Sequence, residues 1–470
     1  MQGTIHDILE ATGGRLVQGR ADTGFAGLSI DSRTIAPGEA FVAIHGEVHD
    51  GHAFLPQVLA GSQASGVVVA ADRLDALAGP LGAHPGTACV AVGDTTRALG
   101  DIAARHRRRM AASVVAITGS NGKTSTRRMT AAVLARRFEI LEPVRNLNNQ
   151  IGVPLTLFRL EKRHQWAVLE LGTSLPGEIA RLAEICRPDI AVVTNVGPAH
   201  LERLGSLEGV AAEKGALVAG LAPGGRAVLN ADDPRVAAMA AGLDENALRF
   251  GLAETARVRA ATVTETAAGV AFDLLIGGAG PRVRLNAHGR VMVHNALAAA
   301  AVGTLLGLSP EDIRAGLESF RPVPGRMGVT ALPGDVHLID DTYNANPASM
   351  CAALETLTAL RGSGRALLVT GDMRELGPEA ARLHRELGRL AAEAGVDRLF
   401  VCGERAADVA AGALAAGMPA AAVATGSRDE IRGALLDALR PGDWVLVKGS
   451  RAMGMETIVR ALGAPTPGRG

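Results

Sequence analysis

The segment 114–130, which reads VVAITGSNGKTSTRRMT, limits the fold of this chain more than any other stretch. Its first residues are apolar and mostly β-branched and predict a buried parallel strand, and a helix is expected from about residue 124 to 137. The glycine-containing loop between them directs backbone N–H groups and a helix dipole at a bound anion. Lys123 offers a charge to phosphate oxygens and Thr124 a hydroxyl to Mg²⁺, although Ile117 replaces the first glycine of the longer phosphate loop. The segment therefore predicts an ATP site formed by Gly119, Ser120, Asn121, Gly122, Lys123, Thr124 and Ser125.

The length, charge and composition of the chain limit the number of domains and the kinds of partner that it is expected to have. A chain of 470 residues is expected to form about three domains. Lys+Arg and Asp+Glu both total 48 and aromatic residues make up 3%, which argues against a nucleic-acid or membrane partner. The N-terminus lacks a signal-peptide pattern, no stretch is long enough to span a membrane, and the four cysteines show no CxxC spacing. These features predict a soluble, cytoplasmic protein, which we expect to be a monomer.

Lysine is rare in this chain, and its positions are informative. The sequence has 44 arginines but only four lysines, and Lys123, Lys214 and Lys448 each adjoin a glycine. Because arginine evidently serves wherever a generic positive charge suffices, a lysine at these positions suggests a compact ammonium or a reactive amine. Lys162 lies in the charged segment 161–164 and is expected to be an ordinary surface residue.

Hydrophobic patterns divide the chain into three predicted domains of the α/β class. Residues 1–93 form a small α/β domain, 94–320 a central P-loop-type domain with a mostly parallel sheet, and 321–470 a Rossmann-like α/β domain. Central strands are expected at 166–171, 190–194 and 226–230, antiparallel strands within 258–285, and an interdomain hinge at 322–325. The tail 465–470 is expected to be disordered.

Two polar turns of the first domain are candidates for holding a phosphorylated ligand. Ser32 and Arg33 follow a short predicted strand, and Asp50, Gly51 and His52 form a second turn. The same residue types are common in turns and helix caps, so the residues alone leave both interpretations open.

Three residues of the central domain are candidate metal ligands. Glu170 ends a predicted strand, at the edge where parallel sheets bind ligands, and could hold Mg²⁺ beside Thr124. His200 follows the next strand, although a lone histidine is more often a capping or core residue. Lys214 could add CO₂ to form a carbamate, which would be an oxygen ligand for a second Mg²⁺.

Further candidates lie near the hinge and in the last domain. Asn295 could read an adenine edge, and Arg326 could reach a phosphate when the domains close. The segment DDTYNANP follows a predicted strand, and its residue types are equally typical of turns. Lys448 and the segment GDMRELG (371–377) also follow predicted strands, so three polar loops are expected at one sheet edge, as a substrate cleft requires.

Taken in order, these motifs resemble those of the Mur ligases, which build the peptide of peptidoglycan on a UDP-sugar. The resemblance covers essentially the whole chain and rests on TGSNGKTS, ELG, TNVGPAHL with Lys214 downstream, HN, GR and DDTYNANP. The segments NNQIGVP (148–154), DDTYNANPASM (340–350) and GDMRELG are most similar to the family member that adds D-alanyl-D-alanine. The DNPR and DYAH-type sequences of the member that adds the third amino acid do not occur in the sequence.

The resemblance implies an ATP-dependent amide ligase of peptidoglycan precursor synthesis, and hence a role in cell-wall biogenesis, cell shape and cell division. Such an enzyme joins D-alanyl-D-alanine to the terminal carboxylate of UDP-N-acetylmuramoyl-tripeptide through an acyl phosphate. The substrate supplies the nucleophile, so the protein is expected to position the reactants and neutralise charge.

The resemblance also implies roles for individual residues. Lys123, His200, carbamylated Lys214 and Lys448 would be catalytic. Of two Mg²⁺ ions, Thr124 and Glu170 would hold one, and His200 and Lys214 the other. Besides the phosphate loop, nucleotide contacts would come from Asn295, Arg326, Asp341 and Asn344. The UDP-substrate would be bound by Ser32, Arg33, Asp50, Gly51, His52 and Asn149, and the dipeptide or the phosphoryl group by Asn346 and Lys448.

Two positions depart from the family pattern. Thr173-Ser174-Leu175 stands where the family often has an asparagine-containing run, which puts substrate contacts near that loop in question. Ala216-Leu217 replaces the usual Glu-Ile after Lys214-Gly215 and removes a carboxylate that could orient the lysine.

Two other functions stay open at this point. A related Mur or folylpolyglutamate-type ligase would accept a single amino acid in place of the dipeptide. A P-loop NTPase switch would hydrolyse nucleotide without any UDP-sugar, and it would leave Lys214 and Lys448 unexplained.

Overall fold

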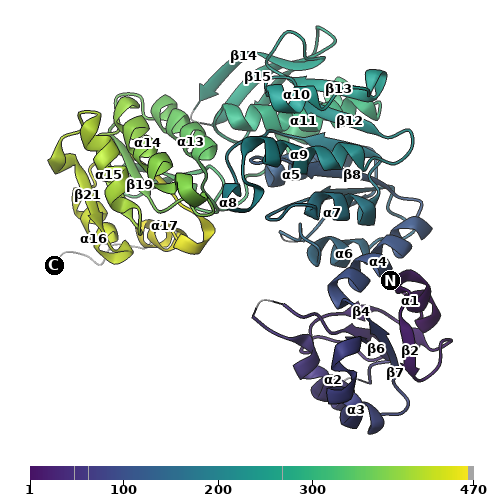
Figure 1. Cartoon of the computed structure of the whole chain (residues 1–470). Coiled ribbons are helices and arrows are strands. Elements are labelled where there is room, and N and C mark those ends of the chain that lie inside the picture. Colours follow the sequence, from purple (N-terminus) through teal and green to yellow (C-terminus); the bar gives the residue numbers. More distant parts are fainter. Residues whose placement is uncertain (47, 62, 145, 267, 464–470) are drawn as a thin grey trace.

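The computed structural model describes residues 1–463 except 47, 62, 145 and 267 (Figure 1). Three main sheets of five, nine and six strands follow one another along the chain, and we call them, with their helices, the N-terminal, central and C-terminal units. Each sheet lies within one of the predicted domains and is mainly parallel, so the predicted α/β class is confirmed. The expectation of disorder at 465–470 concerns residues outside those described.

The N-terminal unit contains a five-stranded sheet whose strands are parallel except for the first. Its order is β2 (Arg15–Gln18), β7 (Ala88–Val92), β6 (Gly66–Ala70), β5 (Ala40–Val42) and β4 (Leu28–Ser29), with β2 antiparallel to β7. Helices α2 (Leu55–Gly61) and α3 (Leu74–Gly82) cover the face that carries Phe41 and Val67. Helix α1 (Ile5–Thr12) covers the opposite face, and β1 (Gly3–Thr4) pairs with β3 (Gly24–Phe25) beside it.

Helix α4 (Thr95–Arg109) connects the N-terminal and central units. It packs on α1 and on two helices of the central unit, within one continuous apolar cluster. Its basic end holds Asp7 of α1, which accepts hydrogen bonds from Arg109 (2.6 Å), Arg105 (3.3 Å) and the Thr4 N–H (3.0 Å). Partial burial raises the pKa of Asp7, but these donors outweigh it and lower the pKa to about 2.

Asp7→Asn is expected to lower the free energy of unfolding by about 1 kcal/mol at pH 7. Because the pKa of Asp7 is lower in the folded state than the usual value of about 3.9, the ionised carboxylate stabilises the protein above pH 4, and this stabilisation is lost as the pH falls toward 2. In thermal unfolding between pH 3 and 7, the difference in stability between the wild type and Asp7→Asn should therefore become smaller below pH 4. Asp22→Asn, which removes an exposed pair with Arg20 in the same unit, is the control and should change nothing measurable. An equal loss from Asp7→Asn at pH 3 and pH 7 would contradict the charge argument.

Strand β8 (Ser113–Thr118) lies inside the nine-stranded sheet of the central unit, whose order is β16-β15-β14-β13-β12-β11-β8-β10-β9. Its neighbours β10 (Trp166–Glu170) and β11 (Ile190–Val193) run parallel to it. Val115 and Ile117 belong to one apolar cluster and Val114 and Ala116 to another, so both faces are buried, as the apolar run predicts. The loops that follow β8, β10 and β11 therefore meet at one sheet edge.

Helices cover both faces of this sheet. Helices α5 (Lys123–Leu134), α11 (Arg290–Leu305) and α12 (Pro310–Glu318) pack together on one face, and α6 (Gly152–Leu157), α7 (Glu178–Cys186) and α9 (Leu207–Ala219) on the other. Helix α5 ends three residues earlier than predicted, since the chain turns at 135–137 toward β9. The shorter α8 (Leu201–Leu204) and α10 (Pro234–Ala238) lie in the connections.

The remaining central strands change direction along the sheet. The strands β9 (Ile140–Leu141), β12 (Arg226–Asn230) and β13 (Ala247–Gly251) are parallel to their neighbours. Then β14 (Val258–Thr266), β15 (Gly269–Ile276) and β16 (Arg282–Leu285) run antiparallel to one another, which confirms the prediction for 258–285. The sequence analysis missed β13, which is short and has the exposed Arg249 at its centre.

The C-terminal unit is a second α/β layer structure. Its sheet order is β17 (Gly328–Leu332), β18 (Val336–Asp341), β22 (Trp444–Lys448), β19 (Ala366–Thr370), β20 (Arg398–Cys402) and β21 (Val423–Gly426), and only β17 is antiparallel. Helices α13 (Pro347–Leu360), α14 (Ala380–Glu393) and α15 (Ala406–Ala415) cover one face, and α16 (Arg428–Ala438) and α17 (Glu456–Gly463) the other. Strand β21 and the last three helices were not predicted; α15 is rich in alanine, whereas α17 is short but clearly amphipathic.

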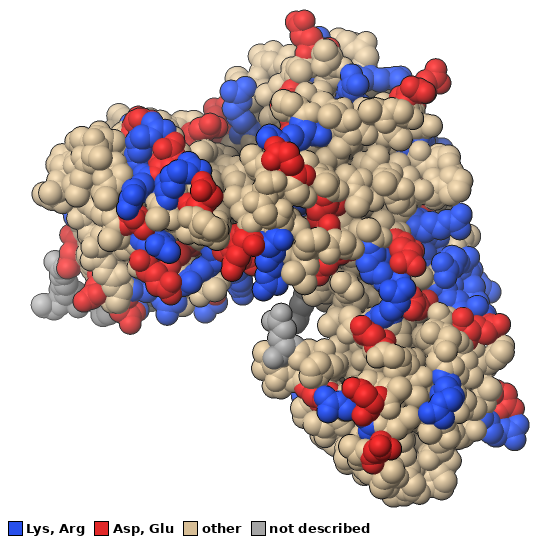
Figure 2. Space-filling model, in the orientation of Figure 1, with Lys and Arg blue, Asp and Glu red and all other residues tan. Residues whose placement is uncertain are grey.

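The central and C-terminal units meet along α8 and the start of α13, whereas the N-terminal unit lies at the far side of the central unit (Figure 1). Gly325 in the predicted hinge has a left-handed backbone, with φ of 74°. Positive and negative side chains are interspersed over the face shown in Figure 2, in keeping with the balanced composition. No helix in the described part of the chain is both long and apolar enough to cross a membrane.

Candidate active site

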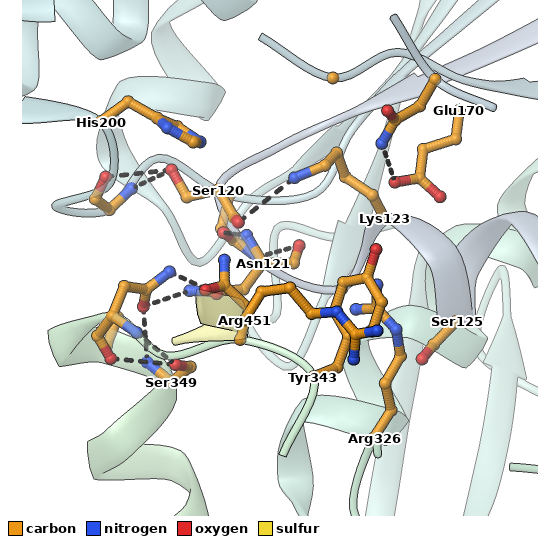
Figure 3. Close-up of a pocket in the computed structure, with 18 of the residues that line it drawn as sticks. Ser120, Asn121, Lys123, Ser125, Glu170, His200, Arg326, Tyr343, Ser349 and Arg451 are labelled. Carbon is orange, nitrogen blue, oxygen red and sulfur yellow. Dashed lines mark hydrogen bonds between the residues drawn. The ribbon is translucent and has the colours of Figure 1, made fainter. Parts of the chain in front are cut away.

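A polar cavity of about 840 Å³ opens where the central and C-terminal units meet (Figure 3). The central unit contributes the phosphate loop and the loops that follow β10 and β11, and the C-terminal unit contributes the loops that follow β18, β19 and β22. The predicted convergence of strand-end loops is therefore observed, and it includes loops from two separate sheets.

The two glycines of the phosphate loop are required by close packing as well as by backbone conformation. Gly119 has φ of 151° and Gly122 has φ of 81°. A Cβ atom at Gly119 would lie 1.9 Å from Thr194 Oγ1, and one at Gly122 would lie 2.2 Å from Asn295 Oδ1. Any side chain at either position would therefore push apart the segments that support the loop.

The loop after β11 braces the phosphate loop from one side. Ser120 Oγ donates to the Gly197 carbonyl (3.0 Å) and accepts from the Gly197 N–H (2.9 Å). The Asn121 N–H donates to Asn195 Oδ1 (2.8 Å), and Thr194 Oγ1 donates to the Asn121 carbonyl (2.6 Å). These hydrogen bonds support the phosphate loop from within the central unit. The sequence analysis noted TNVGPAH but gave Thr194 and Asn195 no role.

Lys123 lies at the floor of the cavity. Its Nζ donates to the carbonyl oxygens of Gly119 (2.8 Å) and Ser120 (3.4 Å), so the ammonium is folded back over the loop (Figure 3). Removal from water lowers the pKa of Lys123; the carboxylate of Glu170 opposes this shift and the charge of Arg326 adds to it. Because burial disfavours the charged form of Lys123, an anion that enters the cavity would strongly stabilise its ammonium group.

Glu170 and Thr124 are adjacent, as predicted, and their donor atoms fit Mg²⁺. Thr124 Oγ1 donates to Glu170 Oε2 (2.7 Å), and both side chains are buried, at 6% and 3% exposed. Asn148 Nδ2 donates to the other oxygen, Glu170 Oε1 (2.9 Å), and so orients the carboxylate. A buried carboxylate and hydroxyl beside a phosphate loop form an all-oxygen donor set that suits a hard cation.

His200 and Lys214 are not joined to each other by any hydrogen bond or ion pair between described residues. His200 Nδ1 instead lies 2.5 Å from Glu375 Oε2 of the C-terminal unit. Lys214 is 1% exposed, and burial together with the charge of Lys123 lowers its pKa to about 7 against the opposing effect of Glu213. Among the described residues, no group of three or more His, Cys, Asp or Glu could hold a metal ion. Any metal site formed by the described residues therefore needs ligands other than these four residue types alone.

The departure at Thr173 has a structural explanation. Thr173 Oγ1 donates to Glu213 Oε1 (3.2 Å), and the same carboxylate accepts from the N–H groups of Gly177 (2.7 Å) and Ile179 (2.7 Å). Glu213 thus caps α7, and its charge remains next to Lys214 although Ala216 lacks the family's carboxylate.

Residues of the C-terminal unit face the phosphate loop across the cavity. The Arg326 guanidinium stacks 4.0 Å from the Tyr343 ring centroid, and its Nε is buried without a hydrogen-bond partner among the described residues (Figure 3). Lys448 Nζ pairs with Asp341 Oδ2 (2.5 Å) and donates to the Asn344 carbonyl (2.8 Å). The structure therefore brings Arg326, Asp341, Asn344 and Lys448 together, as the resemblance implies.

Asn295 lies between this cavity and a second one of about 490 Å³. The second cavity also contains Asp232 and His294, which form a pair at 2.8 Å. Asn295 Oδ1 accepts from Thr126 Oγ1 (3.2 Å) beneath the phosphate loop, so part of this amide is already used to support the loop.

The candidates of the N-terminal unit lie apart from the cavity. Arg33 forms an exposed ion pair with Asp31 (2.7 Å), next to Ser32. His52 is buried between Asp50 (2.6 Å to Nδ1) and the Ala70 N–H (2.9 Å to Nε2), and Gly51 allows close approach to the Ile44 backbone. Both ring nitrogens of His52 are thus engaged within the unit, and its side chain holds the turn. Asn149 lines the main cavity and accepts from the Gly152 N–H (2.9 Å) at the start of α6.

Besides Asn195, two further cavity residues had no predicted role although their segments had been noted. Asn148 belongs to NNQIGVP and Glu375 to GDMRELG, but local sequence gave neither a partner. Their contacts with Glu170 and His200 join residues that are far apart in the chain.

Comparison with known proteins finds Mur ligase family models and similar ligases. A family model described as Mur ligase middle domain matches residues 117–303, and one described as Mur ligase, glutamate ligase domain matches residues 325–451. The UDP-N-acetylmuramoyl-tripeptide–D-alanyl-D-alanine ligase of Escherichia coli (strain K12) is 38% identical over 463 residues, which cover 98% of each chain.

Solved structures agree with this comparison. A MurF crystal structure from Acinetobacter baumannii matches 98% of this chain and 99% of its own, with a TM-score of 0.88 and 32% identity. A MurF ligase from Thermotoga maritima in complex with ADP matches 93% of this chain and 96% of its own, with a TM-score of 0.80 and 26% identity.

Proposed function

Because this chain belongs to the Mur ligase family, we propose that it is the ATP-dependent ligase that joins D-alanyl-D-alanine to UDP-N-acetylmuramoyl-tripeptide. The observation that carries the proposal is one cavity in which a phosphate loop and a buried Glu170–Thr124 pair face Arg326 and Lys448 of a second unit. A P-loop NTPase that acts as a switch would not need Arg326 and Lys448 opposite its phosphate loop. The full-length similarity to relatives named as D-alanyl-D-alanine ligases supports this acceptor over a single amino acid.

The proposed reaction is the one that the family resemblance implies, and the charges in the cavity fit it. An oxygen of the tripeptide's terminal carboxylate attacks the γ-phosphorus of ATP, ADP leaves, and an acyl phosphate forms. The neutral amine of D-alanyl-D-alanine then attacks the acyl carbon, loses a proton, and displaces inorganic phosphate as the amide forms. Lys123 and Arg326 would neutralise the transferring phosphoryl group from opposite sides of the cavity.

The other nucleotide and substrate contacts are part of the same proposal. We place the triphosphate on residues 119–125 and the base toward the second cavity, near Asn295. Asp341 and Asn344 would contact the nucleotide, and Lys448 the phosphoryl group or the dipeptide. The UDP portion would bind Ser32, Arg33, the backbone of the Asp50–Gly51 turn and Asn149. Residues 1–93, 94–320 and 321–470 would then be the substrate, ATP and closing domains.

Mg²⁺ fits the donor set of the cavity. Thr124 and Glu170 would hold one ion, which neutralises phosphate charge when bound. The buried Lys214 amine, with its lowered pKa, is suited to become a carbamate that would hold a second ion together with His200. His200 would have to exchange its Glu375 contact for this role, or share it.

We propose that the reaction takes place in the cytoplasm, where the family resemblance implies that peptidoglycan precursors are built. We also propose that the enzyme acts as a monomer, because both sides of the cavity come from one chain.

The deciding experiment measures phosphate release from ATP and Mg²⁺ with UDP-N-acetylmuramoyl-tripeptide, with and without D-alanyl-D-alanine. We expect release that requires both substrates and a product heavier by one dipeptide residue unit in the mass spectrum. D-Alanine alone serves as the matched control acceptor and should give no product. Turnover with a single amino acid would indicate a related ligase, and release that ignores the UDP-sugar would indicate an NTPase.

A further inference from the structure

Asn346 makes a contact that no role proposed so far explains. It is the N-cap of α13, where its Oδ1 accepts from the Ser349 N–H (2.9 Å). Its side-chain nitrogen is not used for capping and donates across the unit boundary to Asn121 Oδ1 (2.8 Å). Asn121 Nδ2 returns a hydrogen bond to Asn346 Oδ1 (3.2 Å). A reciprocal amide pair therefore ties the C-terminal unit to the phosphate loop.

Both partners of this pair are held by other contacts. Asn121 is fixed through its backbone by Thr194 and Asn195, and it lies centrally among the bonded residues of Figure 3. Asn346 is 8% exposed and is the first residue of a capping box at the start of a 14-residue helix. The Asn121 backbone is thus held by the central unit and the Asn346 side chain by α13, so the pair depends on how the two units are placed relative to each other.

A second contact between the units lies nearby. The Glu202 N–H donates to the Glu375 carbonyl (3.2 Å), and Gly377 packs against Glu202. This contact involves no part of the phosphate loop. Among the hydrogen bonds between described residues, those of the Asn121–Asn346 pair are the ones that join the C-terminal unit to the phosphate loop itself.

We propose that Asn346 is a positioning residue, a latch that couples docking of the C-terminal unit to the conformation of the phosphate loop through Asn121. The proposal rests on the proposed function in placing a nucleotide on that loop. By linkage, a nucleotide that orders the loop favours docking, and docking favours nucleotide binding. Docking also closes the cavity over the acyl phosphate, so the latch protects this species from water.

The helix cap and the latch can be separated by substitution. Asn346→Ser keeps a good N-cap but is too short to reach Asn121. Asn346→Asp also keeps the cap and loses the donor, and it serves if the serine variant fails to fold. Ser427→Asn, which exchanges caps in the opposite direction at the exposed start of α16, is the matched control.

The first readout is hydrogen exchange, which needs no turnover. In Asn346→Ser, amides in peptides covering 119–123 are expected to exchange about tenfold faster, the effect of one net hydrogen bond, while those at 347–351 keep their protection. Faster exchange at 347–351 alone, or unchanged exchange at 119–123, would overturn the latch. In a double-mutant cycle, adding Asn121→Ala to Asn346→Ser should change the exchange rate at 119–123 little further. If the effects of the two substitutions simply add, the pairing is contradicted.

The second readout is the stoichiometry of the reaction. The wild type should release one phosphate for each dipeptide joined. In Asn346→Ser this ratio should rise above one, because water attacks the acyl phosphate, phosphate leaves and the free tripeptide carboxylate is regenerated. A ratio that stays at one would contradict the protective role. If the wild type joins no dipeptide at all, the proposed function fails, and the exchange experiment still decides the latch.

Discussion

Lys123→Ala is expected to lower kcat/KM for ATP-dependent ligation by on the order of 10³-fold, the size typical of removing a preorganised charge from a reaction centre. The ammonium lies over the phosphate loop, close enough to Glu170 and Arg326 to feel their charges, and it is the charge of the central unit placed for the β- and γ-phosphates. Steady-state kinetics with varied ATP would give the loss, and single-turnover measurements would assign it to phosphoryl transfer.

A second substitution and a stability measurement test the role of Lys123 further. Lys123→Arg should lose nearly as much activity, because a planar guanidinium cannot donate to both Gly119 and Ser120 from the same small volume. The melting temperature of Lys123→Ala should equal or exceed that of the wild type. The pKa of Lys123 is lowered on folding, so its charged form is disfavoured in the fold, and its removal costs no stability. A variant that is inactive because it melts early would refute the interpretation.

Lys214→Ala is expected to lower activity by about 100-fold or more, as for loss of a group that holds a metal ligand. At pH 7 an amine with a pKa of about 7 is about half neutral, against about one part in 3,000 for an ordinary lysine. Only the neutral amine adds CO₂, so wild-type activity should fall as the pH drops below about 7. Short carboxylic acids such as acetate should restore part of the activity of Lys214→Ala, because they supply the missing carboxylate.

Lys162→Ala is the matched control, since Lys162 is the exposed lysine of the chain. It should retain full activity and show no response to acetate. Mass spectrometry of the intact wild type under bicarbonate offers an independent measurement, in which one added CO₂ should disappear in Lys214→Ala but not in Lys162→Ala. Rescue that is equal in both variants, or absent from Lys214→Ala, would exclude the carbamate.

Local sequence predicted the parts of the site that sit at the ends of strands. The phosphate loop, Glu170 beside Thr124, and the polar loops of the C-terminal unit follow from apolar runs that end in polar segments, because the ends of parallel strands converge. The same logic gave the α/β class and the antiparallel run at 258–285. It failed for β13, which has an exposed arginine at its centre, for β21, and for the last three helices, of which α15 is rich in alanine.

What the sequence by itself determined is the chemistry available: a loop shaped for phosphate, a carboxylate and a hydroxyl for a cation, and lysines where an arginine would not serve. Only the tertiary structure decided which of these groups face one another. The Asn121–Asn346 pair joins residues 225 positions apart, and the His200–Glu375 contact likewise crosses from one sheet to another. No local pattern encodes such contacts, because they depend on how the two sheets and their helices pack against each other. The physical reason is that helices and strands arise from neighbouring residues, whereas a cavity between two units arises from their packing.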